Sequence, residues 1–107
     1  MNFTAFSAQI EQFVDTSIAR LSTGDTNMCF RYQLDLRELA GRVRLTQKLA
    51  HEAIDFCRTR GVEAEVDQYT GALLIAINLR TCLMNQRQAL DFNTALAFAR
   101  QFHGENL

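Results

Sequence analysis

Hydrophobic residues recur at steps of three and four over residues 3–22, and this period predicts one amphipathic helix. The apolar positions on its inner face are Phe3, Phe6, Ile10, Phe13, Val14, Ile18 and Leu21. Polar side chains such as Gln9, Glu11 and Asp15 occupy most of the opposite side. The polar segment 22–25 contains Gly24 and is expected to end the helix.

The period changes to two over residues 28–34. Phe30, Tyr32 and Leu34 alternate there with polar side chains, which predicts a strand with one face on the core.

A central helix follows, and its first residue is left open between residues 36 and 46. Asp35 and Glu38 have the spacing of a capping box, which favours a start near residue 36. Gly41 weakens a helix by about 1 kcal/mol relative to alanine, which favours a start at Thr46 instead. The helix is expected to end at Gly61, a residue type that commonly follows the last helical turn.

The C-terminal half predicts a hairpin and a last helix. Val62, Ala64 and Val66 alternate with acidic residues, which is typical of a half-exposed strand. Residues 68–71 form a turn of hairpin length. Residues 73–79, LLIAINL, are almost continuously apolar and are expected to form the most buried strand. The last helix is predicted over residues 86–103.

These elements define an α+β protein with the order α-β-α-β-β-α in a single domain, residues 1–107. A crossover between the first two strands makes them parallel, and the hairpin adds an antiparallel strand. We therefore expect a small, three-stranded mixed sheet with helices on one or both of its faces.

Composition narrows the class of protein. With 107 residues, 48% of them hydrophobic and 21% charged, the chain has the balance of a soluble globular domain. No apolar run approaches the roughly 20 residues of a membrane span, and the first residues lack the pattern of a signal peptide. A cytoplasmic location is expected. Cys29, Cys57 and Cys82 have neither paired nor zinc-binding spacing, so we expect free thiols, no metal and no cofactor.

The central helix carries a basic stripe, which raises the question of nucleic-acid binding. Its members are Arg37, Arg44, Lys48, His51 and Arg58. Residues 31–60 have a net charge of +3, and the segment LTQKLA resembles the first helix of helix-turn-helix repressors. However, a strand rather than a second helix follows Gly61, the outer face of the hairpin (Glu63, Glu65 and Asp67) is acidic, and the pI of the chain is 6.1. Nucleic-acid binding is therefore the alternative and not the leading hypothesis.

No motif specifies a reaction. The sequence contains no phosphate-binding glycine loop, no GxSxG and no HExxH. Cys57 lies on the apolar side of its helix, and His51 lies among charged residues. We expect a protein that is not an enzyme.

The last helix carries more apolar surface than one neighbour can cover. Phe92 and Phe98 point about 120° apart, since successive residues turn by about 100°. One side can rest on the sheet, and the other needs the N-terminal helix or a second protein chain. Together with Phe102, these residues form a candidate interface for a partner protein or for a homodimer.

The element order resembles that of type III secretion chaperones, which also begin with a helix and end with a hairpin and a helix. The segment GALLIAINL, followed by a helix, resembles the end of that fold. Those chaperones have more strands before the central helix, where this chain has one predicted strand.

We therefore expect a small, non-catalytic, protein-binding module that acts as an adaptor, an inhibitor or a chaperone-like protein, and as a homodimer. The alternative is a nucleic-acid-binding regulator that uses the basic helix at residues 44–60. The candidate partner-binding residues are Phe92, Phe98, Phe102, Arg44, Lys48, His51 and Arg58.

Overall fold

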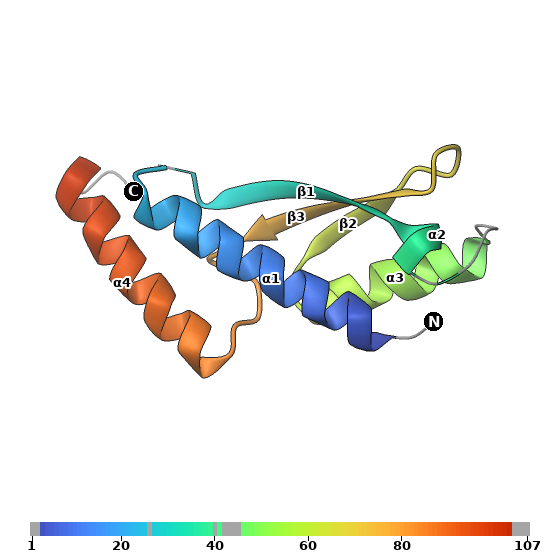
Figure 1. The fold of residues 1–107 in the computed structure, drawn as a ribbon, viewed down its shortest axis with the longest axis horizontal. Coiled ribbons are helices and arrows are strands. Elements are labelled where there is room, and N and C mark those ends of the chain that lie inside the picture. The colour runs from blue at the N-terminus through green and yellow to red at the C-terminus, as the bar shows by residue number, and fades with distance from the viewer. Residues whose placement is uncertain (1–2, 26, 40, 42–45, 104–107) are drawn as a thin grey trace.

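A computed structural model describes residues 3–25, 27–39, 41 and 46–103, with side chains up to residue 101. Its elements are α1 (Phe3–Ser22), β1 (Cys29–Asp35), α2 (Leu36–Leu39), α3 (Gln47–Thr59), β2 (Glu63–Val66), β3 (Ala72–Asn78) and α4 (Gln86–His103). The α+β class, the element order and the three strands agree with the prediction (Figure 1).

The sheet is antiparallel throughout, and not mixed as expected. Its order is β1-β3-β2, and β3 pairs antiparallel with both neighbours. The crossover does make β1 and β2 run in the same direction, but β3 lies between them. The most apolar strand therefore occupies the centre, and the two more polar strands form the edges.

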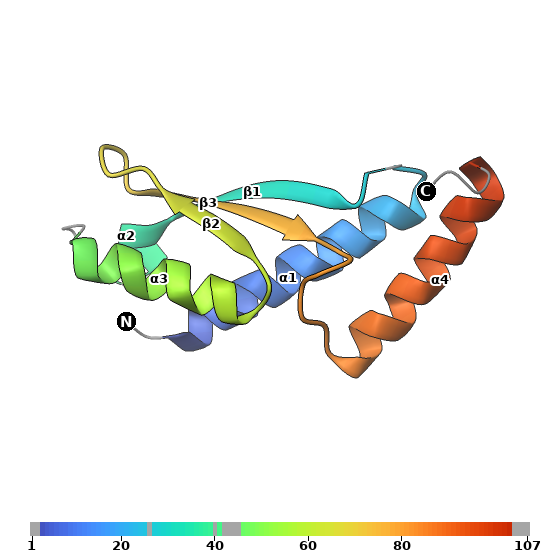
Figure 2. The same ribbon diagram turned by 180° about the vertical axis from the view of Figure 1, so that it is seen from behind.

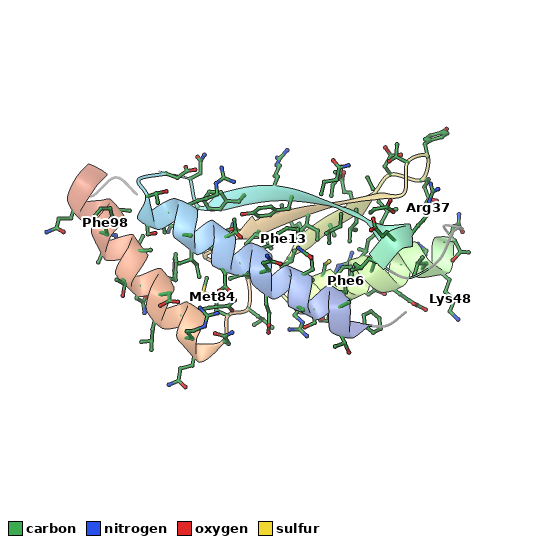
Figure 3. The ribbon with its side chains drawn as sticks, in the orientation of Figure 1. Phe6, Phe13, Arg37, Lys48, Met84 and Phe98 are labelled. Atoms are coloured by element: carbon green, nitrogen blue, oxygen red, sulfur yellow. The ribbon has the colours of Figure 1, made fainter. Side chains whose placement is uncertain are left out.

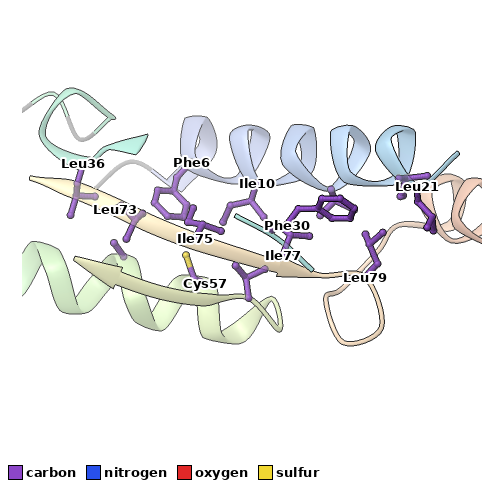
Figure 4. Packing of buried hydrophobic residues seen from close by; sticks show 14 of the residues in the cluster. Phe6, Ile10, Leu21, Phe30, Leu36, Cys57, Leu73, Ile75, Ile77 and Leu79 are labelled. Atoms are coloured by element: carbon purple, nitrogen blue, oxygen red, sulfur yellow. The ribbon is translucent and has the colours of Figure 1, made fainter. Parts of the chain in front are cut away.

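Helices α1 and α3 cover the same face of the sheet and build the core with it (Figures 2 and 4). The buried apolar side chains of β3 are Leu73, Ile75 and Ile77, and α1 contributes Phe6 and Ile10 among others. The opposite face has no helix over it among the described residues. Leu74, which alternates with the buried residues, is therefore 44% exposed, so β3 is buried on one face only.

The central helix is in fact two helices. The Asp35 carboxylate accepts hydrogen bonds from the backbone N–H groups of Arg37 and Glu38, at 3.0 and 3.3 Å, so the cap forms as predicted. Helix α2 nevertheless ends at Leu39. A separate helix α3 begins after Thr46, whose side chain accepts from the N–H of Leu49 at 3.1 Å. Both predicted starts are thus real, because each has its own cap.

Gly61 ends α3 in the left-handed region, with a φ of 67°. Its N–H donates to the carbonyl of Arg58, and the N–H of Val62 donates to that of Cys57. A Cβ at this position would come within 2.4 Å of the Thr81 carbonyl oxygen. Only glycine fits the turn, since both the φ and the space exclude a side chain.

Asp67 was predicted to lie on the outer face of the hairpin, but in the structure it belongs to the turn. Its carboxylate accepts hydrogen bonds from the N–H groups of Tyr69 and Thr70, at 2.9 and 3.4 Å. These bonds hold the pKa of Asp67 below its ordinary value. Glu63 and Glu65 do line the exposed side of β2, as predicted, but Asp67 organises the turn.

Helix α4 lies beyond the end of the sheet and packs on α1 (Figure 1). It does not rest on the sheet, as we expected it to. The molecule is elongated as a result, with extents of 48 × 26 × 18 Å. Among the described residues, no helix is both long enough and apolar enough to cross a bilayer.

Candidate partner-binding surface

The predicted residues of α3 are on the surface. Lys48, His51 and Arg58 are exposed, and Arg58 lies 3.7 Å from the carboxylate of Asp55. Arg44 falls outside the described residues. The stripe is therefore partly neutralised by an acidic residue within it, as its sequence indicated.

The predicted residues of α4 lie on different sides of that helix. Phe92 is half-buried and packs against the core, whereas Phe98 is 46% exposed. The side chain of Phe102 is not among those that the structure describes. Among the described side chains, α4 is therefore covered on the side of Phe92 and exposed on the side of Phe98, so the expected coverage on more than one side is not seen there.

The α3 and α4 groups do not form one site. Figure 3 shows Lys48 and Phe98 at opposite ends of the long dimension of the molecule. A partner that contacts one group does not contact the other, unless it spans the whole chain.

Small residues and one buried amide attach α4 to α1. Ala95 and Ala99 are 3% and 0% exposed, which lets the two helices approach closely. Gln88, only 2% exposed, donates from Nε2 to the Glu11 carbonyl and to the Asp15 carboxylate, each at 3.1 Å. These directed bonds determine where α4 lies along α1.

Gln88 also closes a capping box at the start of α4. Its N–H donates to the Asn85 side chain at 2.8 Å, and its Oε1 accepts from the N–H of Asn85 at 3.0 Å. The sequence NQRQ has the spacing of this motif, so pattern analysis could have identified the cap. The contact of Gln88 with α1 has no local signal, because its partners are more than 70 residues away.

An ion-pair network beside Gln88 neutralises the first turn of α4. Arg87 donates to the carboxylates of Asp15 and Asp91, each at 3.0 Å. The hydrogen bond to Asp15 is the main reason that the pKa of Arg87 is raised. The single positive charge of Arg87 is therefore fully compensated by the two carboxylates around it.

The outer side of α4 carries two exposed large apolar residues, Leu90 and Phe98. Leu90, Thr94 and Phe98 follow one another at steps of four, so they lie on one stripe, which we call the outer stripe. It is turned away from Gln88, Ala95 and Ala99. Leu90 is 62% exposed, and so is Leu83 in the segment that leads into the helix.

The open face of the sheet is a second exposed surface, which sequence analysis missed. Leu74 and Ala76 lie in its centre, with Arg31 and Gln33 on β1 at one side and Glu63 and Glu65 on β2 at the other. A shallow depression of about 470 Å³ covers this face. Periodicity did not predict it, because both faces of β3 are apolar in sequence.

Two groups that could in principle take part in chemistry, the Cys57 thiol and the Ser17 hydroxyl, are buried in the core. Cys57 is fully buried, and burial raises the pKa of its thiol to about 12, so the reactive thiolate is suppressed. The described residues contain no group of three or more His, Cys, Asp or Glu that could hold a metal ion. The buried Ser17 hydroxyl contacts that of Tyr32 at 2.7 Å and donates to a helix carbonyl, so it is structurally satisfied.

Comparison with known proteins finds no matching family model, no curated protein and no solved structure with significant similarity to this chain.

Proposed function

We propose that this protein is a non-catalytic, protein-binding module that acts as a homodimer in the cytoplasm and holds a partner polypeptide on the outer stripe of α4. The observation that carries the proposal is the exposure of Leu90 on a helix whose opposite side is attached to α1. An adaptor, an inhibitor and a chaperone-like protein would all use such a surface.

The electrostatics of the outer stripe support an apolar partner. Arg87 and Asp91 lie beside the stripe, three residues before Leu90 and Thr94, and Arg87 is paired with the carboxylates of Asp15 and Asp91. The centres of protein interfaces are depleted of charged residues for the same reason: apolar contact there avoids the cost of removing charges from water. The three cysteines are free, which supports a reducing compartment.

A matched pair of substitutions on α4 tests the proposal. Leu90→Glu places a charge on the outer stripe, and Asn93→Glu places the same charge on another exposed position of the helix. We expect the wild type and Asn93→Glu to retain the same polypeptide in stoichiometric amount from an extract of the native cell, and Leu90→Glu to lose it. Equal retention by Leu90→Glu would contradict the proposal, provided that thermal unfolding shows all three proteins to be folded.

The alternative, nucleic-acid binding through α3, has one observation in its favour: Lys48, His51 and Arg58 are all exposed. The Asp55–Arg58 pair and the exposed Glu63 and Glu65 oppose it. We expect no specific complex when labelled DNA is titrated at physiological salt. A sequence-specific complex tighter than about 10⁻⁷ M would favour this alternative over a protein partner.

A further inference from the structure

Among the described residues, strand β1 has no neighbouring strand at the outer edge of the sheet, so a row of its backbone groups faces outward. The N–H of Leu36 donates to Gly71, and that of Leu79 donates to Met28, each at 2.9 Å. Because antiparallel residues alternate between facing their partner and facing away, even-numbered residues of β1 bond to β3. The N–H and C=O groups of Cys29, Arg31 and Gln33 therefore point outward. Neither ribbon view shows another described element beside this edge (Figures 1 and 2).

This edge lacks two features that often prevent pairing between sheets, a very short strand and a proline. It extends over seven residues in unbroken register with β3, and the chain contains no proline. The other edge strand, β2, has four residues and lies against α3. The β1 edge is thus the better template for a further strand.

We infer that a second copy of this chain occupies the β1 edge, so that two sheets join into one antiparallel sheet of six strands. This inference rests on the proposed homodimer and names its interface. A two-fold axis at Gln33 places the outward N–H groups of each copy opposite the outward C=O groups of the other. Residues equally distant from Gln33 along the two strands then face each other.

Charge complementarity selects this register. Arg31 faces Asp35 of the second copy, and the symmetry repeats the ion pair on the other side. A register centred on Arg31 would place two guanidinium groups opposite each other. Arg31 has no ion-pair partner within the described chain, and Asp35 is held in place because its Oδ1 caps α2. Its Oδ2 remains to accept from Arg31.

On the helix-facing side of the sheet, the β1 side chains of the two copies are complementary as well. Tyr32 and Leu34 are half-buried, and Phe13 of α1 stacks on Tyr32 with ring centroids 4.4 Å apart. In the same register Tyr32 faces Leu34 of the second copy, which would cover the exposed parts of both side chains. An unrelated extended peptide could supply the hydrogen bonds, but not both of these matches.

Two edge prolines test the inference. Gln33→Pro removes an N–H that points away from β3, a position at which an edge strand tolerates proline. Ala64→Pro does the same on β2, where the bond from the Asp67 N–H to Ala72 places odd-numbered residues toward β3. In sedimentation equilibrium at micromolar concentration, we expect the wild type and Ala64→Pro to approach twice 12.2 kDa. Gln33→Pro should raise the dimer Kd by about tenfold or more.

Charge substitutions provide a second measurement in case the proline variant does not fold. Arg31→Asp should raise the dimer Kd by about tenfold or more, because two carboxylates then face each other at each symmetric contact. Arg31→Lys should retain the dimer. A wild-type protein that stays monomeric would overturn the inference, and so would a dimer that neither Gln33→Pro nor Arg31→Asp weakens. A wild-type monomer would also overturn the proposed homodimer, whereas a dimer that neither variant weakens would overturn the edge interface alone. The Leu90→Glu capture experiment tests partner binding separately.

Discussion

Helix α1 is held on two sides by different chemistry. Toward the sheet it buries large apolar side chains, with Phe6 packed edge-on against Phe56 of α3 at a centroid distance of 5.2 Å. Toward α4 it meets alanines, the Gln88 amide and the Arg87–Asp15 ion pair. Apolar burial is strong but non-directional, whereas hydrogen bonds are modest in net energy and specific in geometry.

The two sides of α1 therefore have different roles: the sheet side stabilises the fold, and the other side determines where α4 lies. The sheet side of α1 buries large apolar side chains, and the α4 side determines the position of a helix whose buried apolar residues, among those described, are the small Ala95 and Ala99. We therefore expect α4 to open locally at a lower free energy than the core. A helix of this kind suits partner binding, because its outer stripe stays available while its orientation is fixed.

Chemical labelling of the cysteines should show the largest measurable difference between the core and the segment before α4. Burial raises the pKa of Cys57 in the core from 9.0 to about 12, which lowers its thiolate fraction about a thousandfold. Burial also raises the pKa of Cys82, which lies half-buried in the segment before α4. Mass spectrometry of the native protein treated with iodoacetamide should find the order Cys29, Cys82, Cys57, from fastest to slowest. Equal labelling rates for Cys29 and Cys57 would show that the core is accessible to the reagent.

The same buried thiol predicts an alkaline pH dependence. Cys57 keeps its proton in the folded state, while the unfolded state loses it at an ordinary thiol pKa. Its contribution to stability is therefore fully present below pH 9 and is lost as the pH rises toward 12. Urea unfolding across this range should show a steeper loss for the wild type than for Cys57→Ala. Parallel curves would argue against a protonated buried thiol.

Truncation of a buried side chain in β3 should weaken the apolar core between the sheet and α1. Ile75→Ala removes a side chain that is 1% exposed, and we expect a loss of about 2–5 kcal/mol in the free energy of unfolding. Leu74→Ala, one position away on the open face, is the control and should cost far less. Urea denaturation measures both. Similar losses for the two variants would mean that another surface covers the open face.

Removal of the buried Gln88 amide should weaken the polar contact between α1 and α4. Gln88→Ala leaves the Glu11 carbonyl and the Asp15 carboxylate without this donor, so we expect a loss of about 1–3 kcal/mol. Gln86→Ala on the exposed start of the same helix is the matched control. Amide hydrogen exchange should increase in α4 more than in the sheet. A uniform increase throughout the chain would show that α4 and the core open together.

Substitution on α3 should have the smallest effect. Lys48 is exposed and belongs to neither side of α1, so Lys48→Ala should change the free energy of unfolding by no more than about 0.5 kcal/mol. A partner with an acidic surface that docks on α3 would instead show slower association with this variant at low salt. Stopped-flow mixing at two salt concentrations distinguishes these results.

Local features of the fold were predictable because neighbouring residues determine them. The period of apolar positions located α1 closely, and the last helix was predicted over residues 86–103, where α4 lies. The caps at Asp35 and Thr46 and the turn at Gly61 also follow from adjacent residues. Each of these signals involves hydrogen bonds or steric limits within a few positions along the chain.

Partner choice was not predictable, because a hydrophobic pattern shows which residues favour burial but not what buries them. Phe92 and Phe98 are the same residue type on one helix, yet only Phe92 packs against the core. The inward position of Gln88 depends on a helix at the other end of the sequence. All of the candidate partner-binding residues stay predictions, and the side chains of Arg44 and Phe102 also lie outside those that the structure describes.

The sequence by itself determined the class, the order of elements and their caps, since periodicity and local hydrogen bonding are encoded over short stretches. Only the tertiary structure decided that β3 lies between β1 and β2, that α1 and α3 cover one face, and that α4 packs on α1. These choices depend on which surfaces can be closed together in three dimensions. Inserting the most apolar strand in the centre buries it best, and the same choice leaves Leu74 exposed and the edge of β1 unpaired.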